Sequence, residues 1–336
     1  MKKVVQLVVG LAALPTLALT SLADHHEEAG FLSLFDGKSL KDWDGNPKFW
    51  SVQDGAITGI TTKENPTKGN TFIIWRGGTV DDFELRLQFK IVGGNSGIQY
   101  RSKDHGNWVV GGYQGDFEAG KTFSGILYEE RGRGILAQRG QKTVIHPGKD
   151  KHRVEVVGSI GESAEIQAVI KEEQWNDYKI IARGYEFTHV INGRVTSQVT
   201  DLDRKGRTES GILALQLHAG PPMNVQFRNI RIKPFKGINL SGKWGFEVET
   251  DQGTGEPQFD LKQSGNQVTG TYEGLFGTQK VEGTLRGNRL TLIVEGDYEG
   301  QSMVSTYEGK VTGFNSIEGS LNINDQIDAT FTGTKR

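Results

Sequence analysis

The stretch FELRLQFKI, Phe83–Ile91, decides the fold class, because apolar and polar side chains alternate along its whole length. Successive side chains of a β-strand point to opposite faces of a sheet. One face carries Phe83, Leu85, Leu87, Phe89 and Ile91, and the other carries Glu84, Arg86, Gln88 and Lys90. The pattern predicts a strand in a sheet that buries one side and exposes the other.

Shorter alternating runs surround this strand and are separated by Gly, Asn and Asp turns. They predict further strands at Thr71–Trp75, Ser96–Arg101, Tyr113–Phe117, Gly125–Tyr128, Ala164–Ile170, Asp177–Ala182, Glu186–Ile191, Gly211–His218 and Val225–Ile232. Asn192-Gly193 is expected to form a hairpin turn, since both residues tolerate a positive φ. Phe31–Phe235 is therefore predicted to be all-β, with two packed sheets in a jelly-roll-like sandwich.

The composition shifts at Pro234–Leu240, after which Gly recurs in units such as QVTGTYEG, KVEGTLRG and YEGKVTG. Each unit resembles a short strand that enters a tight turn. Residues 238–336 are therefore predicted to form a smaller antiparallel β-barrel or meander, with Trp244 and Phe246 in its core. Because its Glu and Asp residues are scattered, we interpret this segment as an accessory domain.

The whole chain has 336 residues, 46 Gly, 8 Pro and no Cys, which indicates a globular protein of about two domains without disulfides. Its net charge of −2 offers no basic field for a nucleic-acid partner. Met1–Ala23 has two Lys residues before an apolar run and predicts a secretory signal peptide. We expect a soluble protein, exported to the periplasm or the extracellular space and not embedded in a membrane, with residues 24–30 as a flexible N-terminus.

Polar side chains gather in Asn95–Glu118, which is expected to form two facing strands across a Gly-rich loop. Alternation along the strands places Gln99 and Arg101 on one face of the first strand. The same face of the second strand carries Gln114, Asp116 and Glu118, while Tyr113 and Phe117 point to the core. An Arg, two amides and an acid pair on one face of a sheet predict a polar pocket.

Eight collinear segments from Phe31 to Phe235 resemble the family of 3-keto-disaccharide hydrolases. They are FLSLFDGKSLKDW (31–43), FWSVQDGAITG (49–59), DFELRLQFKI (82–91), NSGIQYR (95–101), GYQGDFE (112–118), SGILYE (124–129), QWNDYKIIARG (174–184) and SGILALQLHAGPPMNVQFRNIRIKPF (210–235). The resemblance implies a concanavalin-like jelly roll that cleaves or hydrates 3-keto sugars, an activity also described as 3-keto-glucoside lyase and hydratase. The tail outside these segments resembles a lipocalin-like β module.

The chemistry of a 3-keto-glycoside assigns roles to the focal residues. The ketone acidifies the C2 proton, so a base can remove it, the enolate can expel the C1 substituent, and water can then add. Asp116 is the candidate base, because a nearby Glu118 would make ionising both carboxyls costly. Arg101 is expected either to clamp the enolate or sugar hydroxyls, or to form a structural salt bridge with Asp116.

A second part of the pocket is expected from the strand Gly211–His218, where Gln216 and His218 share the polar face. His218 could be an acid or a base, or it could be hydrogen-bonded to a loop carbonyl. The remaining candidates for substrate binding are Gln99, Gln114, Gln216, Tyr128 at the rim, Trp108 as a stacking surface, and Glu84. Plain packing or solvation is the alternative for the last three.

No cofactor is expected to be required. His105, Asp104 and Asp116 could be combined into a divalent metal site, but their spacing matches no standard ligand pattern. The sequence also has no Walker loop, dinucleotide fingerprint or Gly-x-Ser-x-Gly elbow. The substrate ketone would therefore come from a separate sugar 3-dehydrogenase upstream in the pathway.

Two other functions remain open at this point. The pattern Gln114-x-Asp116-x-Glu118 resembles the Glu-x-Asp-x-Glu strand of jelly-roll glycoside hydrolases, although an amide replaces the usual nucleophile. A lectin-like carbohydrate-binding module is the other alternative, since the same sandwich supports both classes. A lectin needs only hydrogen bonds from Asp116 and His218, whereas an eliminating enzyme needs them to titrate.

Overall fold

The computed structural model describes residues 30–251, 253–324 and 326–336. The predicted signal peptide, residues 1–23, and nearly all of the predicted flexible N-terminus, residues 24–30, lie outside these ranges. Among the described residues, no helix is long and apolar enough to cross a membrane.

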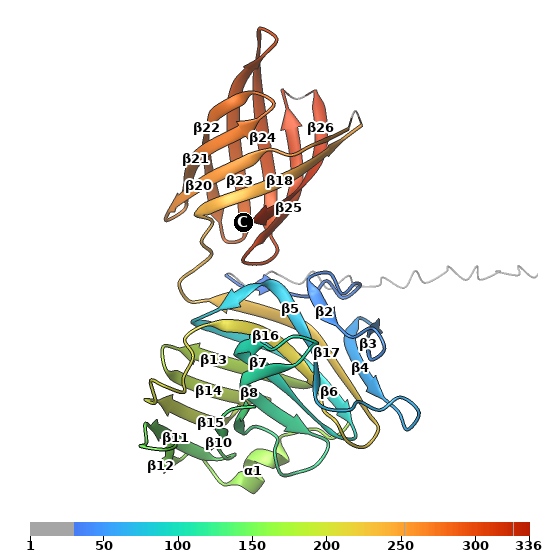
Figure 1. The fold of residues 1–336 in the computed structure, drawn as a ribbon, viewed down its shortest axis with the longest axis vertical. Coiled ribbons are helices and arrows are strands. Elements are labelled where there is room, and N and C mark those ends of the chain that lie inside the picture. The colour runs from blue at the N-terminus through green and yellow to red at the C-terminus, as the bar shows by residue number, and fades with distance from the viewer. Residues whose placement is uncertain (1–29, 252, 325) are drawn as a thin grey trace, which may run out of the picture.

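Two mainly antiparallel sheets pack face to face in the first part of the chain, which forms the lower body in Figure 1. The larger sheet contains β1 (Leu32–Ser33), β3 (Trp50–Gln53), β4 (Ala56–Thr61), β6 (Phe83–Val92), β11 (Gln141–His146), β12 (Arg153–Ser159), β13 (Asn176–Arg183), β14 (Glu186–Ile191), β15 (Arg194–Asp201) and β17 (Met223–Pro234). The smaller sheet has the order β10 (Gly134–Ala137), β9 (Leu127–Glu130), β8 (Val110–Glu118), β7 (Asn95–Asp104), β16 (Gly211–Leu217), β5 (Thr71–Val80) and β2 (Trp43–Gly45). The all-β sandwich predicted from the sequence is confirmed.

Aromatic side chains from both sheets fill the space between them. The rings of Phe89 on β6 and Phe117 on β8 lie 4.0 Å apart between centroids, and those of Tyr113 on β8 and Phe187 on β14 lie 4.5 Å apart. The predicted apolar face of Phe83–Ile91 is buried against this layer, and so are Tyr113 and Phe117. Alternation therefore assigned the core face of β6 and β8 correctly.

A charged cluster ties the two sheets together at one end of this core. The guanidinium of Arg133 donates to Glu129 of β9 over 2.6 Å, to Asp201 of β15 over 2.6 Å and to Asp203 over 3.3 Å. Tyr113 also donates to Asp201, over 2.5 Å. Asp201 is fully buried, so its charge depends on these partners for stabilisation.

The segment Ala164–Ile170, predicted as a strand, instead contains the helix α1 (Ser163–Ala168). Ile166 alone of its side chains is buried, so no alternating buried face exists here. Ala, Glu and Gln are good helix formers, which favours one helical turn over a strand. The predicted Asn192-Gly193 hairpin is confirmed between β14 and β15, with φ values of 48° and 78°.

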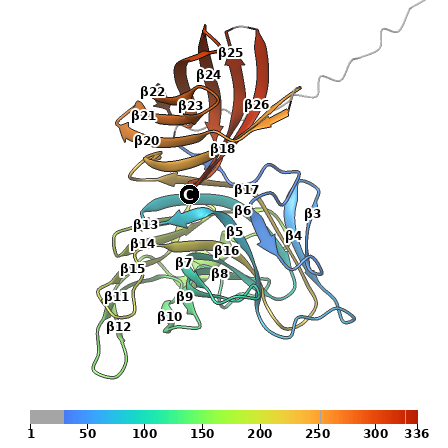
Figure 2. The same ribbon diagram turned by 45° about the horizontal axis from the view of Figure 1, so that its top comes forward.

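The last part of the chain forms a third sheet that closes into a barrel, the upper body in Figures 1 and 2. Its strands are β18 (Gly242–Thr250), β20 (Gln258–Ser264), β21 (Gln267–Gly274), β22 (Gly277–Arg286), β23 (Arg289–Tyr298), β24 (Gln301–Val311), β25 (Ser316–Ile323) and β26 (Ile327–Lys335), with β19 (Gly253–Gly255) on the edge of β18. Pairing of β18 with β26 closes the barrel. Trp244 and Phe246 are buried in it, as expected.

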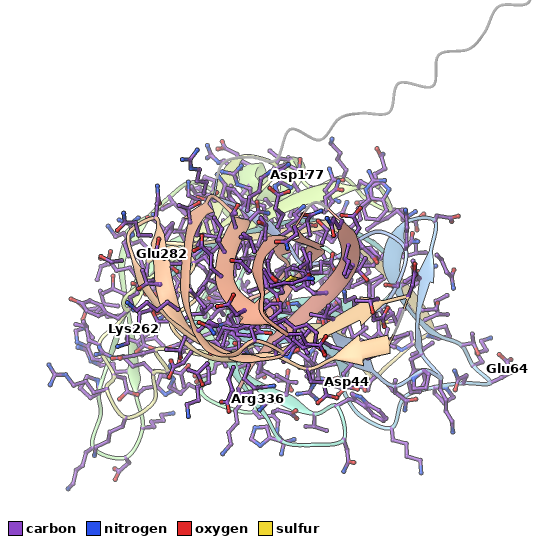
Figure 3. The ribbon with its side chains drawn as sticks, turned by 90° about the horizontal axis from the view of Figure 1, so that it is seen from above. Asp44, Glu64, Asp177, Lys262, Glu282 and Arg336 are labelled. Carbon is purple, nitrogen blue, oxygen red and sulfur yellow. The ribbon has the colours of Figure 1, made fainter. Side chains whose placement is uncertain are left out.

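The barrel touches the sandwich near β5. The rings of Trp75 and Phe314 meet edge to face with centroids 5.6 Å apart, and Lys41 forms an ion pair with Glu318 over 2.6 Å. Figure 3, which looks down from above, shows the curved barrel strands lying over the sandwich. These contacts involve the end of the smaller sheet near β2 and β5.

Candidate functional site

A cavity of about 270 Å³ opens on the face of the smaller sheet that points away from the sandwich core. It is lined by Asn70, Asn95, Gln114, Asp116, Glu118, Phe123, Ile126, Tyr128, Glu130, Ile135 and His218. These residues come from β7, β8, β9 and β10, from the loop between β8 and β9, from the residue before β5 and from the residue after β16. Of the ten site residues expected from the sequence, five lie in this wall: Asp116, Glu118, Gln114, Tyr128 and His218.

The floor of the cavity depends on alternation along β8 and on a glycine in β7. Asp116 points away from the core because its neighbour Phe117 points into it. Gly97 lies opposite Asp116 in the paired strand, and a Cβ atom there would lie 2.4 Å from the Gln114 side chain. A larger residue at this position would therefore displace Gln114 from its place beside Asp116.

Asp116 is a buried carboxyl with only 6% of its surface exposed. Burial raises the pKa of Asp116 to about 7, hydrogen bonds from Gln114 and Asn95 act in the opposite direction, and the charges of Glu130 and Glu118 add to the increase. Asp116 thus exists as both acid and carboxylate near neutral pH. This is the range in which a general base works well.

A chain of amides fixes which atom of Gln114 faces Asp116. Ser102 Oγ contacts Gln99 Oε1 at 2.7 Å, and Gln99 Nε2 donates to Gln114 Oε1 over 2.6 Å. Gln114 Nε2 then donates to Asp116 Oδ1. Gln99 is fully buried and does not line the cavity, so it acts on Asp116 only through Gln114.

Glu118 lines the cavity, but its carboxylate also holds the loop that follows β8. Glu118 Oε1 accepts the backbone N–H groups of Thr122 and Phe123 over 2.6 and 3.0 Å. This arrangement is a structural use of the carboxylate that sequence reasoning did not anticipate. The proximity of Asp116 and Glu118, which the sequence argument required, contributes to the raised pKa of Asp116.

The opposite wall of the cavity combines His218 with a carboxylate that sequence reasoning missed. Glu130 accepts hydrogen bonds from Asn70 Nδ2 over 3.3 Å and from Gln216 Nε2 over 3.3 Å. Gln216 is fully buried beneath this wall and does not line the cavity. His218 Nδ1 lies 2.6 Å from the carbonyl of Ala219, so Nδ1 must carry a proton to donate to this oxygen, and Nε2 is the other ring nitrogen.

Arg101 lies away from the cavity, so neither arrangement expected for it is present. A β-bulge sets Arg101 and Ser102 against the single residue Gly112, and the φ of Arg101 is 47°. The bulge turns the buried guanidinium to Asp82, 2.8 Å away, and to the carbonyl of Asp81, 2.6 Å away. It therefore braces turns at the end of the sheets rather than clamping a sugar or pairing with Asp116.

Trp108 and Glu84 also lie outside the cavity wall. Trp108 Nε1 donates to Asp44 Oδ1 over 2.7 Å, which ties the β7–β8 loop to β2. Glu84 lies on the larger sheet and pairs with Arg86 over 2.5 Å. Both take the packing and surface roles that the sequence left open as alternatives.

The residues considered for a metal site do not converge. Asp104 accepts from Arg76 over 2.7 Å, at the opposite end of β7 from the position that pairs with Asp116. Within the described ranges, no group of three or more His, Asp or Glu side chains could hold a metal ion. A metal that uses His105, Asp104 and Asp116 together therefore does not fit this arrangement.

Sequence reasoning also missed Asn70, Asn95, Phe123, Ile126 and Ile135 in the cavity wall. Glu130 could have been found, because it lies two positions after Tyr128 and so shares its face. The predicted strand ended at Tyr128, whereas β9 continues to Glu130. Asn95 begins β7 and lies on the same face as Gln99, so alternation could also have placed Asn95 in the site.

Comparisons with solved structures give distant likenesses. A candidate glycosyl hydrolase from Parabacteroides distasonis is 19% identical over 61% of this chain and 99% of that chain, with a TM-score of 0.39. The carbohydrate-binding module CBM66 from Bacillus subtilis is 14% identical over 56% of this chain and 94% of that chain, with a TM-score of 0.36. Likenesses this weak decide nothing about activity. No curated protein matched the chain.

A comparison with protein families gives a specific match over the sandwich. The matching family is described as the 3-keto-alpha-glucoside-1,2-lyase-like domain, and the match covers residues 30–233. This range includes both sheets apart from Pro234 at the end of β17, and every residue that lines the cavity. Because the match covers more than half of the chain, the protein belongs to the family of 3-keto-alpha-glucoside-1,2-lyase-like domains.

Proposed function

We propose that this protein cleaves 3-keto-glycosides by elimination followed by addition of water, with Asp116 as the base that removes the C2 proton. The observation that carries the proposal is the buried carboxyl of Asp116, whose pKa is raised to about 7, in the wall of a small cavity. Membership of the lyase-like family supports the same chemistry. A base with this pKa is largely ionised just above neutral pH yet still binds a proton well.

The proposed steps balance in protons and electrons without oxidation or reduction. Asp116 takes the proton from C2, and the electrons of that bond form the C2–C3 double bond of an enolate. The enolate then re-forms the ketone and expels the C1 oxygen, which receives a proton from an acid. Water adds to C1 of the unsaturated ketone while C2 takes a proton back, so the net result is hydrolysis.

His218 is the proposed acid for the departing oxygen, with Gln114, Tyr128 and Glu118 as further contacts of the substrate. Its Nδ1 is held at the carbonyl of Ala219, so Nε2 is the atom that can exchange a proton in the cavity. Asn70 and Asn95 add amide groups that can bind hydroxyl or ketone oxygens. Glu130 across the cavity favours retention of the proton on Asp116 after transfer, since its charge raises the pKa of that group.

Two parts of the proposal concern the protein's setting. The ketone would be introduced by a separate sugar 3-dehydrogenase, because the proposed steps at this cavity only move protons. The signal-like residues 1–23 support export to the periplasm or beyond. This protein and the dehydrogenase would then both act on sugars outside the cytoplasm.

Ordinary retaining glycoside hydrolysis is a less suitable function for this site. That mechanism needs a nucleophilic carboxylate and an acid about 5–5.5 Å apart. Position 114 has an amide that donates to Asp116, and Glu118 is engaged with the backbone of the next loop. A raised pKa at Asp116 is also unnecessary for a lectin, which binds sugars without proton transfer.

The mature protein is expected to consume 3-keto-trehalose without added nucleotide and to leave trehalose intact, since trehalose has no acidic C2 proton. The value of kcat/KM should rise as the pH passes through about 7, because Asp116 must lose its proton to act as the base. Product release by chromatography across pH 5–9 measures both effects. Retention of trehalose on a column with no turnover of 3-keto-trehalose would instead indicate a lectin.

A further inference from the structure

Residues 119–124, in the loop between β8 and β9, carry an aromatic side chain to the edge of the cavity. Phe123 lines the cavity and is nevertheless 40% exposed. Ile126 and Ile135 line the same cavity, so apolar side chains lie in its wall together with the polar side chains of Asp116 and Glu130. Of these apolar side chains, Phe123 is the one that extends into solvent.

Two charged side chains hold this loop in place. The carboxylate of Glu118 accepts the N–H groups of Thr122 and Phe123, as described above. Arg139 donates to the carbonyls of Lys121, Thr122 and Ser124 over 2.7, 3.3 and 2.8 Å. The loop backbone is therefore fixed from both sides.

The way in which Arg139 is held indicates that the loop conformation matters. Arg139 is 8% exposed, and the hydrogen bonds of its guanidinium end on backbone carbonyls, including that of Ser163 at 3.1 Å. Burial lowers the pKa of Arg139, which shows that its charge is held at a cost. Phe123 stays exposed although Arg139 is buried. Burial of the loop's largest side chain therefore does not compensate for the cost of burying Arg139.

The size of the cavity indicates what Phe123 contacts. A volume of about 270 Å³ lies just below the range of roughly 300–1,000 Å³ that is usual for drug-sized ligands. It suits a single sugar ring, so the second unit of a disaccharide must lie beyond the rim. Aromatic rings offer a rigid apolar surface to such a unit.

We propose that loop 119–124 forms a leaving-group subsite in which Phe123 stacks on the apolar face of the departing sugar ring. The proposal deepens the function proposed above and rests on it for the identity of the reaction. Arg139 acts in this subsite as a positioning residue that holds the loop, and Glu118 holds the same loop in addition to its contact with the substrate. The subsite selects substrates by the size of the leaving group and takes no part in proton transfer.

The test compares two substrates that differ only in the leaving group. Phe123→Ala should lower kcat/KM for 3-keto-trehalose about tenfold and leave that for methyl 3-keto-α-glucoside within about twofold. Phe123→Trp should restore the disaccharide rate. Tyr298→Ala in the barrel is the matched control, since Tyr298 is also about 39% exposed. Equal losses on both substrates, or no loss on either, would overturn the proposal.

A binding measurement separates this proposal from the proposed reaction. If the wild-type protein turns over neither substrate, the reaction is wrong, and NMR titration with trehalose and with methyl α-glucoside then tests the subsite alone. The subsite requires Phe123→Ala to weaken trehalose binding about tenfold while methyl α-glucoside binding stays unchanged. Unchanged trehalose binding in the variant would contradict it.

Discussion

Asp116→Asn is expected to lower kcat/KM for 3-keto-trehalose by at least about 100-fold, because an amide cannot accept the C2 proton. The change keeps the side-chain shape, and the amide oxygen can still accept the hydrogen bond from Gln114. Steady-state kinetics at pH 8 measures the loss. Asp260→Asn, at an exposed position of the barrel, is the matched control and should retain full activity.

The same substitution is expected to stabilise the fold at high pH. The pKa of Asp116 is about 7 in the folded protein and 3.8 in its ordinary state, so the folded chain binds the proton more tightly. The contribution of Asp116 to the free energy of unfolding is complete below about pH 4 and is lost as the pH rises towards 7. Above that value it does not change further. The complete loss amounts to roughly 4 kcal/mol, of which Asn should recover about 1–3 kcal/mol at pH 8.

Melting temperatures at pH 4, 6 and 8 test this expectation. The gap between Asp116→Asn and the wild-type protein should widen from pH 4 to pH 8, with the variant melting higher at pH 8. Parallel curves would show that Asp116 has an ordinary pKa, and the argument for it as a base would then fail. Conflict between stability and activity at one residue is common where a site is buried for function.

Arg133→Met is expected to have the largest effect on stability, about 3–5 kcal/mol, because it leaves buried carboxylates without their partner. Arg133 binds Glu129, Asp201 and Asp203, and Asp201 is fully buried. Denaturant unfolding at pH 7 measures the change. Arg153→Met, at a side chain 61% exposed on β12, should cost under about 0.5 kcal/mol.

The outcome also separates two accounts of this cluster. If Arg133→Met costs less than about 1 kcal/mol, the carboxyls of Glu129 and Asp201 must bind protons in the variant, and the cluster does not hold the sheets together through charge. A large loss that diminishes at low pH would support the ionic account, because protonation relieves the unpaired carboxylates.

Strand alternation was sufficient to predict the sandwich and the floor of the cavity. It placed Gln114, Asp116 and Glu118 on one face of β8 and Phe117 on the other. Alternation gave the wrong position for Arg101, because a bulge shifts the register by one residue. No residue type near Arg101 indicates this bulge in the sequence. Where a bulge is not recognised, alternation assigns the side chains at the bulge to the wrong face.

The parts of the site that could not be predicted depend on contacts between distant segments. Asn70 reaches Glu130 only because β5, β16, β7, β8 and β9 are neighbours in the sheet, an order the chain sequence does not reveal. The loop that presents Phe123 depends on Arg139, whose sequence context resembles that of any surface Arg. The cluster around Arg133 likewise becomes visible only in three dimensions.

The fate of the C2 hydrogen tests the central claim most directly. The substrate is 3-keto-trehalose with deuterium at C2, cleaved in ordinary water, and the released 3-keto-glucose is examined by mass spectrometry. The same labelled 3-keto-glucose incubated with Asp116→Asn measures spontaneous exchange. Removal of the C2 hydrogen by Asp116 predicts loss of the label above this background and slower turnover of the deuterated substrate. Full retention of deuterium at an unchanged rate would contradict the account and establish direct hydrolysis at C1.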